Sequence, residues 1–159
     1  MTADKTPQYI KLDERNHVEK PFLDQLAGLG WEIIDLDSKQ HPGDSYRQNF
    51  TEVVMLKVLR AQLKIINDWL DDDQVEEVVK QLTAGFPGTD LIKNNRHVFT
   101  LLLENTSVSE NRRTGEKSPT VRFVDFTHRD NNRFIAGCQL KVRILGTEHH
   151  VVPDIVLFL

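Results

Sequence analysis

The chain has 159 residues, of which 39% are hydrophobic and 28% are charged, and its formal net charge is −4. These values are typical of one folded domain, residues 1–159, and no apolar run approaches the roughly 18 residues that a transmembrane helix needs. The N-terminal residues lack the apolar stretch of a signal peptide, and Cys138 is the one cysteine, so an internal disulfide is excluded. We therefore expect a cytoplasmic protein with no membrane contact.

Basic residues are concentrated in the C-terminal part of the chain. Residues 112–149 carry eight Lys or Arg against four Asp or Glu, whereas residues 1–111 carry twelve basic and nineteen acidic groups. The C-terminal part is therefore the one that can face a polyanion. The alternative is a solvated surface of mixed sign, because dedicated nucleic-acid-binding domains carry a larger basic excess.

The first predicted elements are a helix and a strand. A helix is expected to begin near Asp13 and to stop at Gly28 and Gly30, with Val18 and Leu26 on its apolar face. Residues 31–36 are apolar at most positions and predict a strand. Residues 37–50 are polar and predict a loop.

Residues 51–103 predict a helical segment made of three helices. In the first, over 53–70, a helical stripe is expected from Val54, Val58, Ile65 and Trp69. The second is expected to begin at the acidic residues 71–77, which favour a helix N-terminus; a metal site is the alternative, but consecutive helical side chains point in different directions. An interruption at Gly85, Pro87 and Gly88 precedes the third helix, over 91–103.

After a mobile polar loop at 109–118, the apolar pattern changes to a period of two residues. This pattern predicts strands at 121–126, 134–145 and 151–159, joined by turns at 130–133 and 146–148. Cys138 is expected to be a small core residue of the second strand. Helices and strands in one chain predict an α/β domain.

Pro153 and Asp154 precede the apolar run of the last predicted strand. A carboxylate at the start of a buried strand can hold a hard cation such as Mg²⁺ together with water and a substrate phosphate. Such a cation assists phosphodiester hydrolysis. The alternative is an aspartate that caps a turn. The sequence contains no Gly-rich phosphate loop, Cys-x-x-Cys or His-Glu-x-x-His pattern that would predict another kind of site.

The order and spacing of several segments are typical of one family. The chain resembles the N-terminal domain of the restriction (R) subunit of type I restriction–modification enzymes. The resemblance covers most of the chain and is carried by Glu19, Leu26, Gly30-Trp31, Leu91-Ile92-Lys93-Asn94-Asn95, Val121-Arg122-Phe123-Val124-Asp125-Phe126, Asp130-Asn131-Asn132-Arg133-Phe134, Gln139 and Pro153-Asp154-Ile155-Val156-Leu157-Phe158.

The resemblance implies a PD-(D/E)xK restriction-endonuclease-like fold, in which helices flank a mixed sheet and residues 51–103 form a helical insertion. It also implies Mg²⁺-dependent cleavage of DNA, with Asp154 as a metal ligand and Glu19 as an assisting carboxylate. The family's glutamate and lysine lie on the next strand, so we expect a domain truncated at its C-terminus and inactive alone. The family's ATP-driven motor lies further downstream.

The expected partners are double-stranded DNA and the modification and specificity subunits of the restriction complex. Arg129 and Arg133, in the basic part of the chain, are the candidates for DNA contact. Two other interpretations remain: a non-catalytic module that docks a protein or DNA through its helical insertion, and an unrelated small α/β protein in which Pro153-Asp154 is fortuitous.

Overall fold

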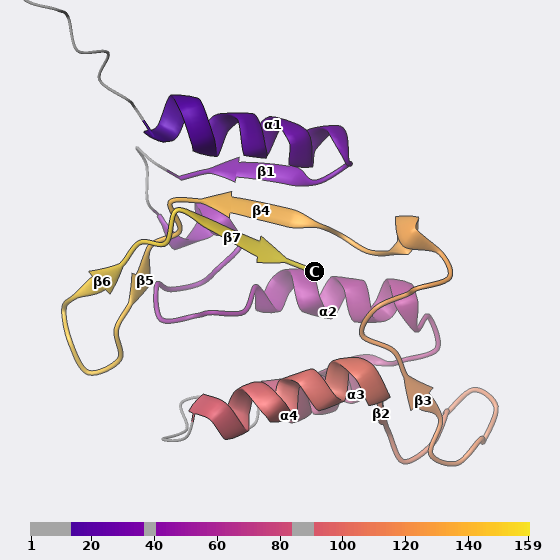
Figure 1. Ribbon diagram of the computed structural model, residues 1–159. Helices are drawn as coiled ribbons and strands as arrows, with labels where there is room; N and C mark the ends of the chain where they lie inside the picture. The colour runs from indigo at the N-terminus through magenta and orange to yellow at the C-terminus, as the bar shows by residue number, and fades with distance from the viewer. Residues whose placement is uncertain (1–13, 37–40, 84–90) are drawn as a thin grey trace, which may run out of the picture.

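The computed structural model describes residues 14–36, 41–83 and 91–159, which form a mixed α/β fold (Figure 1). The helical elements are the π-helical η1 (Arg15–Glu19), α1 (Lys20–Gly28), the 3₁₀ turn η2 (Pro42–Ser45), α2 (Leu56–Ile66), α3 (Asp72–Thr83), α4 (Leu91–Glu104) and the 3₁₀ turn η3 (Arg129–Asn131). The strands are β1 (Glu32–Asp35), β2 (Thr106–Ser107), β3 (Thr120–Val121), β4 (Ile135–Cys138), β5 (Val142–Arg143), β6 (His150–Val151) and β7 (Ile155–Phe158). The predicted interruption at Gly85, Pro87 and Gly88 and the predicted helix start at Asp13 lie outside the described residues.

A three-stranded sheet in the order β1-β4-β7 organises the molecule. β1 runs parallel to β4, and β7 runs antiparallel to it. The central strand β4 is buried at every position, because its small and β-branched side chains are covered by neighbouring strands and helices. In Figure 1, α1 lies beside β1, whereas α2, α3 and α4 lie on the β7 side. The sheet is therefore mixed and flanked by helices, as the sequence predicts.

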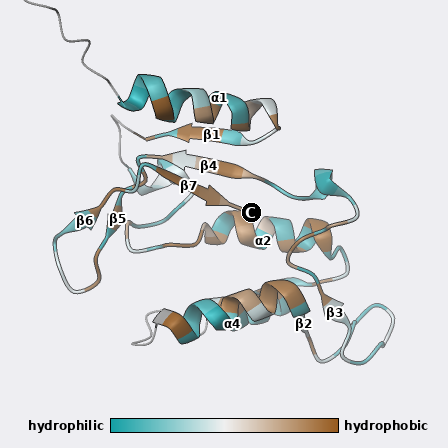
Figure 2. Cartoon of the chain, viewed as in Figure 1, coloured by the Kyte–Doolittle hydropathy of each residue, from teal (hydrophilic) through white to brown (hydrophobic). Residues whose placement is uncertain are grey.

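The predicted helical segment is confirmed as three helices, and these share a core of their own. Leu63 of α2 and Val75 and Val78 of α3 are buried there. Val121 and Phe123, which follow the helices in sequence, close the same cluster. Along α2 and α4, apolar residues in brown alternate with polar residues in teal, as expected of helices with one buried face (Figure 2).

The apolar stripe predicted for the first of these helices is wrong in part: Val54 and Trp69 lie outside α2, and Ile65 lies on its exposed side. Ile65 is 53% exposed, whereas Leu63 is only 1% exposed. Leu56 and Leu59 also pack against the core cluster. The buried face of α2 is thus rotated from the predicted one, because this helix carries more apolar residues than one stripe can hold.

The acidic residues before and within α3 form a helix N-terminus, in agreement with the prediction. The side chain of Asp71 accepts a hydrogen bond of 2.9 Å from the backbone N–H of Gln74, which is the geometry of an N-cap. Asp72 and Asp73 lie in the first helical turn, where negative charge is favourable. Arg112 approaches from the β2–β3 loop and pairs with Asp71.

The predicted strands are shorter than the period-two pattern indicates. Of the predicted strand 121–126, only Val121 pairs as part of a strand, although Phe123 and Asp125 keep the alternation of buried positions. The predicted strand 134–145 divides into β4 and β5, and 151–159 divides into parts of β6 and β7. A period of two in the sequence indicates which side chains face inward. It does not indicate strand pairing, because pairing also requires a neighbouring backbone.

Asp125 anchors the loop that leads to β4. Its carboxylate accepts hydrogen bonds from the backbone N–H groups of Thr127 and His128, both at 2.9 Å, and from the side chain of Asn131 at 2.8 Å. These donors, the N–H of His128 first, lower the pKa of Asp125 to about 2. The ionised carboxylate therefore stabilises the folded chain at neutral pH.

Replacing Asp125 by asparagine is expected to lower the unfolding temperature at pH 7. The folded-state pKa lies below the ordinary value of about 3.9, so the stabilisation is complete above pH 4 and is lost as the pH falls towards 2. Thermal unfolding followed by circular dichroism at pH 7, 4 and 2.5 should show the difference from the wild type shrinking over the last interval. Asp130→Asn, at an exposed position nearby, is the control. Equal unfolding temperatures for Asp125→Asn and the wild type at pH 7 would contradict the assignment.

Within the described parts of the chain, no helix has both the length and the apolar character required to cross a lipid bilayer.

Candidate active site

Three strand ends meet at one edge of the sheet. Asp35 at the end of β1 is in register with Cys138 at the end of β4, and Cys138 is in register with Ile155 at the start of β7. Because β1 and β4 are parallel and β7 is antiparallel, the ends of β1 and β4 and the start of β7 lie at the same edge, with β4 between Asp35 and Asp154. The carboxylates of Asp35 and Asp154, which are far apart in the sequence, therefore lie at the same edge of the sheet.

Asp154 is exposed and lies next to the end of β4. Its backbone carbonyl accepts a hydrogen bond of 2.8 Å from the N–H of Gln139, and its Oδ1 accepts one of 3.3 Å from the Gln139 side-chain amide. The expected pairing of its strand with the strand that contains residues 135–138 is present. The expected burial of β7 is absent. Leu157 is 47% exposed, and within the described residues β7 pairs with another strand on one side only.

Glu19 reaches the same edge from the other side of β4. It is the last residue of η1 and directly precedes α1, and it is half-buried. Its Oε2 lies 3.7 Å from Sγ of Cys138, which donates a weak hydrogen bond to it. The structure therefore brings Glu19 and Asp154 to the adjacent residues Cys138 and Gln139, although 135 positions of sequence separate the two carboxylates.

Cys138 is a core residue, as predicted, and its thiol stays protonated at neutral pH. The side chain is 1% exposed, and burial, helped by the nearby Asp35 and Glu19 carboxylates, raises its pKa to about 11. A buried thiol with a raised pKa is a poor nucleophile. Cys138 can therefore support Glu19 by a hydrogen bond, and covalent catalysis by this group is disfavoured.

Asp35 is the third carboxylate at this edge. It forms an ion pair with Arg15 of η1, whose Nη2 donates to both carboxylate oxygens, at 2.8 and 3.0 Å. The pair fastens the segment that carries Glu19 to the end of β1. An exposed ion pair of this kind contributes little to stability, about 0–1 kcal/mol.

The donor set at this edge suits a hard cation. Mg²⁺ is held in proteins by one or two carboxylates, with water and substrate phosphate supplying the other ligands. Asp154 and Glu19 provide carboxylate oxygens, and the thiol of Cys138 beside Glu19 is buried. Within the described residues, no three His, Cys, Asp or Glu side chains are close enough to enclose a metal ion together. The arrangement is therefore an open site that needs further ligands.

Arg129 and Arg133 lie at the opposite end of β4 from Asp154. Nε and Nη2 of Arg133 both donate to Oε2 of Glu32, at 2.9 and 2.7 Å, and the guanidinium lies 4.6 Å from the centre of the Tyr46 ring. Arg129 donates a hydrogen bond of 2.8 Å to the carbonyl of Leu29. Both cations are thus engaged within the chain, and DNA contact by either remains a prediction.

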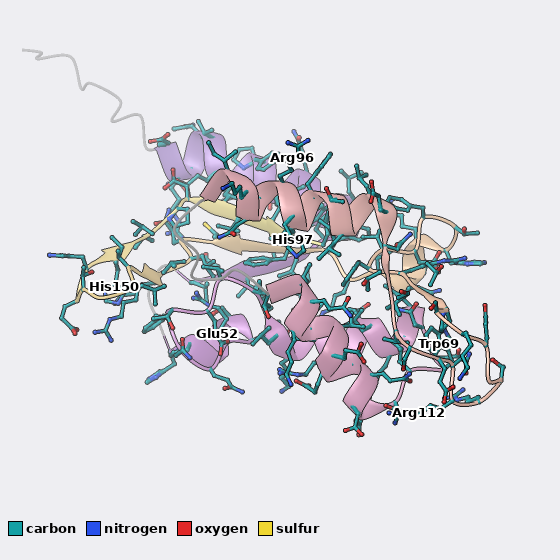
Figure 3. The ribbon with its side chains drawn as sticks, turned by 90° about the horizontal axis from the view of Figure 1, so that it is seen from below. Glu52, Trp69, Arg96, His97, Arg112 and His150 are labelled. Atoms are coloured by element: carbon teal, nitrogen blue, oxygen red, sulfur yellow. The ribbon has the colours of Figure 1, made fainter. Side chains whose placement is uncertain are left out.

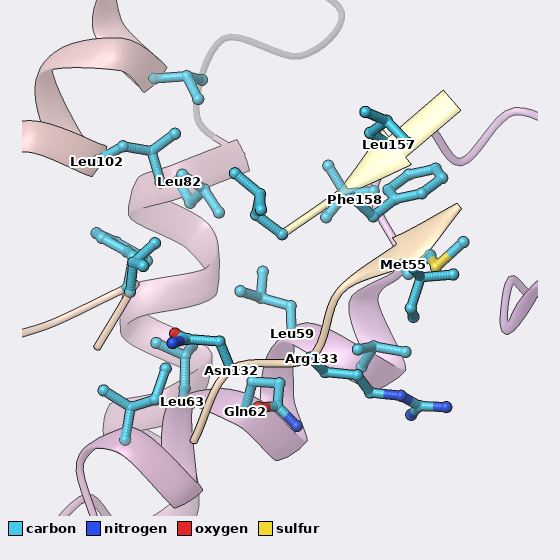
Figure 4. Close-up of a pocket in the computed structure, with 18 residues that line it drawn as sticks. Met55, Leu59, Gln62, Leu63, Leu82, Leu102, Asn132, Arg133, Leu157 and Phe158 are labelled. Atoms are coloured by element: carbon cyan, nitrogen blue, oxygen red, sulfur yellow. The ribbon is translucent and has the colours of Figure 1, made fainter. Parts of the chain in front are cut away.

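An apolar cavity of about 370 Å³ lies between α2, α4 and the end of β7 (Figure 4). Leu59, Leu102 and Phe158 are among its lining residues, and Asp154 and Glu19 are not. Gln62 also lines it, and Oε1 of this side chain is buried without a hydrogen-bond partner among the described residues. Apolar walls do not suit phosphate or a cation, so this cavity is distinct from the carboxylate edge.

Sequence reasoning missed Asp35, Arg15 and the contacts of Gln139. Asp35 directly follows the apolar pair Ile33-Ile34 at the end of a predicted strand, and that position is a signal for a strand-end carboxylate. The parallel pairing of β1 with β4 is what brings Asp35 to this edge. Periodicity does not reveal which strands pair.

Comparison with known proteins agrees with the resemblance. Residues 11–159 match the family described as type I restriction enzyme R protein N terminus. The chain is 34% identical, over 144 residues, to the type I restriction enzyme HindI endonuclease subunit of Haemophilus influenzae. The matched stretch is 90% of this chain and 14% of that relative, so the chain spans a small part of the relative's length. The chain therefore belongs to the family of type I restriction enzyme R protein N-terminal domains.

Proposed function

We propose that this chain is part of the DNA-cleaving domain of a type I restriction enzyme R subunit. In this proposal the domain has a PD-(D/E)xK-like fold and acts as a Mg²⁺-dependent endonuclease in a cytoplasmic, ATP-driven complex with modification and specificity subunits. The substrate is double-stranded DNA. The observation that carries the proposal is the convergence of Glu19 and Asp154 on the last residue of β4 and the one after it, in a chain that belongs to this family.

Each residue at the carboxylate edge has a defined task in this proposal. Asp154 presents an exposed carboxylate at the start of β7, and Glu19 presents a half-buried one from the helical side. Both are the residues that would hold Mg²⁺, which when bound polarises the phosphate and lowers the pKa of water. Arg15 and Asp35 keep the segment of Glu19 on the sheet. The exposure of Asp154 leaves room for a DNA backbone to approach it.

The role of Glu19 is testable in the assembled enzyme. Glu19→Gln keeps the shape of the side chain and removes the negative charge, so plasmid cleavage with Mg²⁺ and ATP is expected to fall roughly 10- to 100-fold, as for the loss of a metal-supporting group. Glu14→Gln is the matched control, because Glu14 is an exposed glutamate that directly precedes η1. Equal cleavage rates for both variants and the wild type would remove Glu19 from the site.

A second candidate function, docking of a partner through the helical segment, is supported by the outer face of α4. Ile92, Phe99 and Leu103 are 82%, 62% and 62% exposed and follow one another at helical spacing along one side of that helix. Arg96, which is labelled in Figure 3, and Lys93 are exposed on the same helix. Exposed apolar residues rimmed by charge are typical of contact surfaces. Serine at all three apolar positions would weaken assembly with the other subunits if this face docks, and would leave assembly unchanged if it does not.

A further inference from the structure

Gln139 has a backbone conformation that is unusual for its residue type. Its φ is 58°, in the left-handed region, where residues other than Gly, Asn and Asp are rare. It directly follows the last residue of β4, and the chain turns there before β5 begins at Val142. Backbone strain of this kind persists only where surrounding contacts maintain it, and it is concentrated at functional sites.

Two hydrogen bonds join Gln139 to Asp154 at the carboxylate edge. The backbone N–H of Gln139 donates to the carbonyl of Asp154 at 2.8 Å, and its Nε2 donates to Oδ1 of Asp154 at 3.3 Å. The preceding residue, Cys138, accepts a hydrogen bond of 3.1 Å from the N–H of Leu36 and contacts Glu19. One turn of backbone therefore touches both candidate carboxylates.

The side-chain contact leaves part of the Asp154 carboxylate available. Gln139 Nε2 holds Oδ1, and in the described chain Oδ2 accepts no hydrogen bond. A hydrogen bond to an ionised carboxylate is stronger than one between neutral groups, so a single amide can restrict the rotation of an exposed side chain. The remaining oxygen can bind a cation in a defined direction.

We propose that Gln139 is a positioning residue for Asp154: its left-handed backbone and its side-chain amide together orient the carboxylate towards the cation that the site is inferred to bind. This inference rests on the proposed function of Asp154. If only the left-handed turn were needed at this position, glycine would supply it without strain. The glutamine side chain is explained if its amide has a task.

Gln139→Gly separates the two contributions, because glycine accepts a φ of 58° and so keeps the backbone turn, while the side chain that carries the amide is removed. In the full-length R subunit, assembled with its partner subunits, we expect DNA cleavage to fall roughly 10- to 100-fold. The Mg²⁺ concentration for half-maximal cleavage should rise about tenfold, because the carboxylate loses its preferred orientation. Binding of Mn²⁺ to the nucleotide-free subunit, measured by calorimetry, should weaken by a similar factor. The ATPase rate and the unfolding temperature should not fall.

Ser118→Gly is the matched control. Ser118 also has a left-handed φ, 49°, and is exposed in the loop between β2 and β3, so the same substitution relieves the same kind of strain elsewhere. Its cleavage rate and metal dependence should equal those of the wild type. If Gln139→Gly behaves like Ser118→Gly, the positioning role is wrong. Loss of ATPase together with cleavage would equally contradict it, because the proposal confines the effect to Asp154.

Asp154→Ala in the same assay distinguishes the two proposals. If Asp154→Ala cleaves normally, the proposed function fails, and the role of Gln139 fails with it. If Asp154→Ala is inactive and Gln139→Gly cleaves at the wild-type rate with unchanged Mn²⁺ binding, only the role of Gln139 fails. Loss of cleavage in both variants, with weaker Mn²⁺ binding in both, supports both proposals.

Discussion

Asp154→Ala is expected to abolish DNA cleavage by the assembled enzyme while its ATPase rate stays close to that of the wild type. A metal ion stabilises the transition state of phosphodiester cleavage by several kcal/mol, and each 1.36 kcal/mol is a factor of ten in rate, so the loss should reach about 10³-fold or more. In the proposed function, ATP hydrolysis belongs to a motor further along the R subunit, so it is not expected to use this carboxylate. Parallel measurements of plasmid cleavage and phosphate release with Mg²⁺ and ATP check both expectations.

Asp68→Ala is the control for this experiment. Asp68 is exposed between α2 and α3, and its backbone carbonyl, which alanine keeps, accepts a hydrogen bond from Arg113. It should cleave like the wild type. Near-normal cleavage by Asp154→Ala would show that Pro153-Asp154 is only the start of a strand. A parallel loss of ATPase would indicate that the substitution damages the protein more widely.

Leu63→Ala is expected to produce the largest loss of stability. Leu63 is 1% exposed and lies in the core cluster shared by α2, α3 and the residues that follow the helices. Truncation of a buried leucine removes transfer free energy and leaves a void, at a cost of about 2–5 kcal/mol in the free energy of unfolding. For a chain of this size this corresponds to a fall of roughly 5–15 °C in unfolding temperature.

Ile65→Ala on the same helix is the comparison, since Ile65 is 53% exposed. Its effect should stay within about 0.5 kcal/mol, as for most surface substitutions. Urea unfolding can be followed by tryptophan fluorescence, because Trp69 packs against the helical core and Trp31 directly precedes β1. Equal midpoints for the two variants would mean that the face of α2 containing Leu63 is not the buried one.

The positions of the helices follow from local chemistry, which the sequence displays directly. Asp71 is a favourable N-cap residue, and the helix after it begins where the acidic residues predict. The choice of buried face does not follow in the same way. α2 carries both Leu63 and Ile65, and only packing against α3 and Val121 decides that the first is buried.

The hairpin at residues 142–151 illustrates the limit of strand prediction. His150 lies on it, at one end of the molecule, and Arg112 lies at the other (Figure 3). The apolar pattern of 134–145 continues through Gln139 without a Gly or Pro to mark the break. The strand ends there because Gln139 adopts a left-handed conformation held by Asp154, a contact across fifteen residues that no local pattern encodes.

The sequence by itself determined the family, the α/β class and the candidate carboxylates Glu19 and Asp154, because motif order, periodicity and residue chemistry are properties of the chain as written. Only the tertiary structure decided which groups share an edge. Parallel pairing of β1 with β4 adds Asp35 to that edge, and antiparallel pairing of β7 adds Asp154. The tertiary structure also places Arg133 at the opposite end of β4, where it pairs with Glu32. The physical reason is that strand pairing depends on backbone hydrogen bonds between distant segments, and these bonds leave no periodic signal in the side chains.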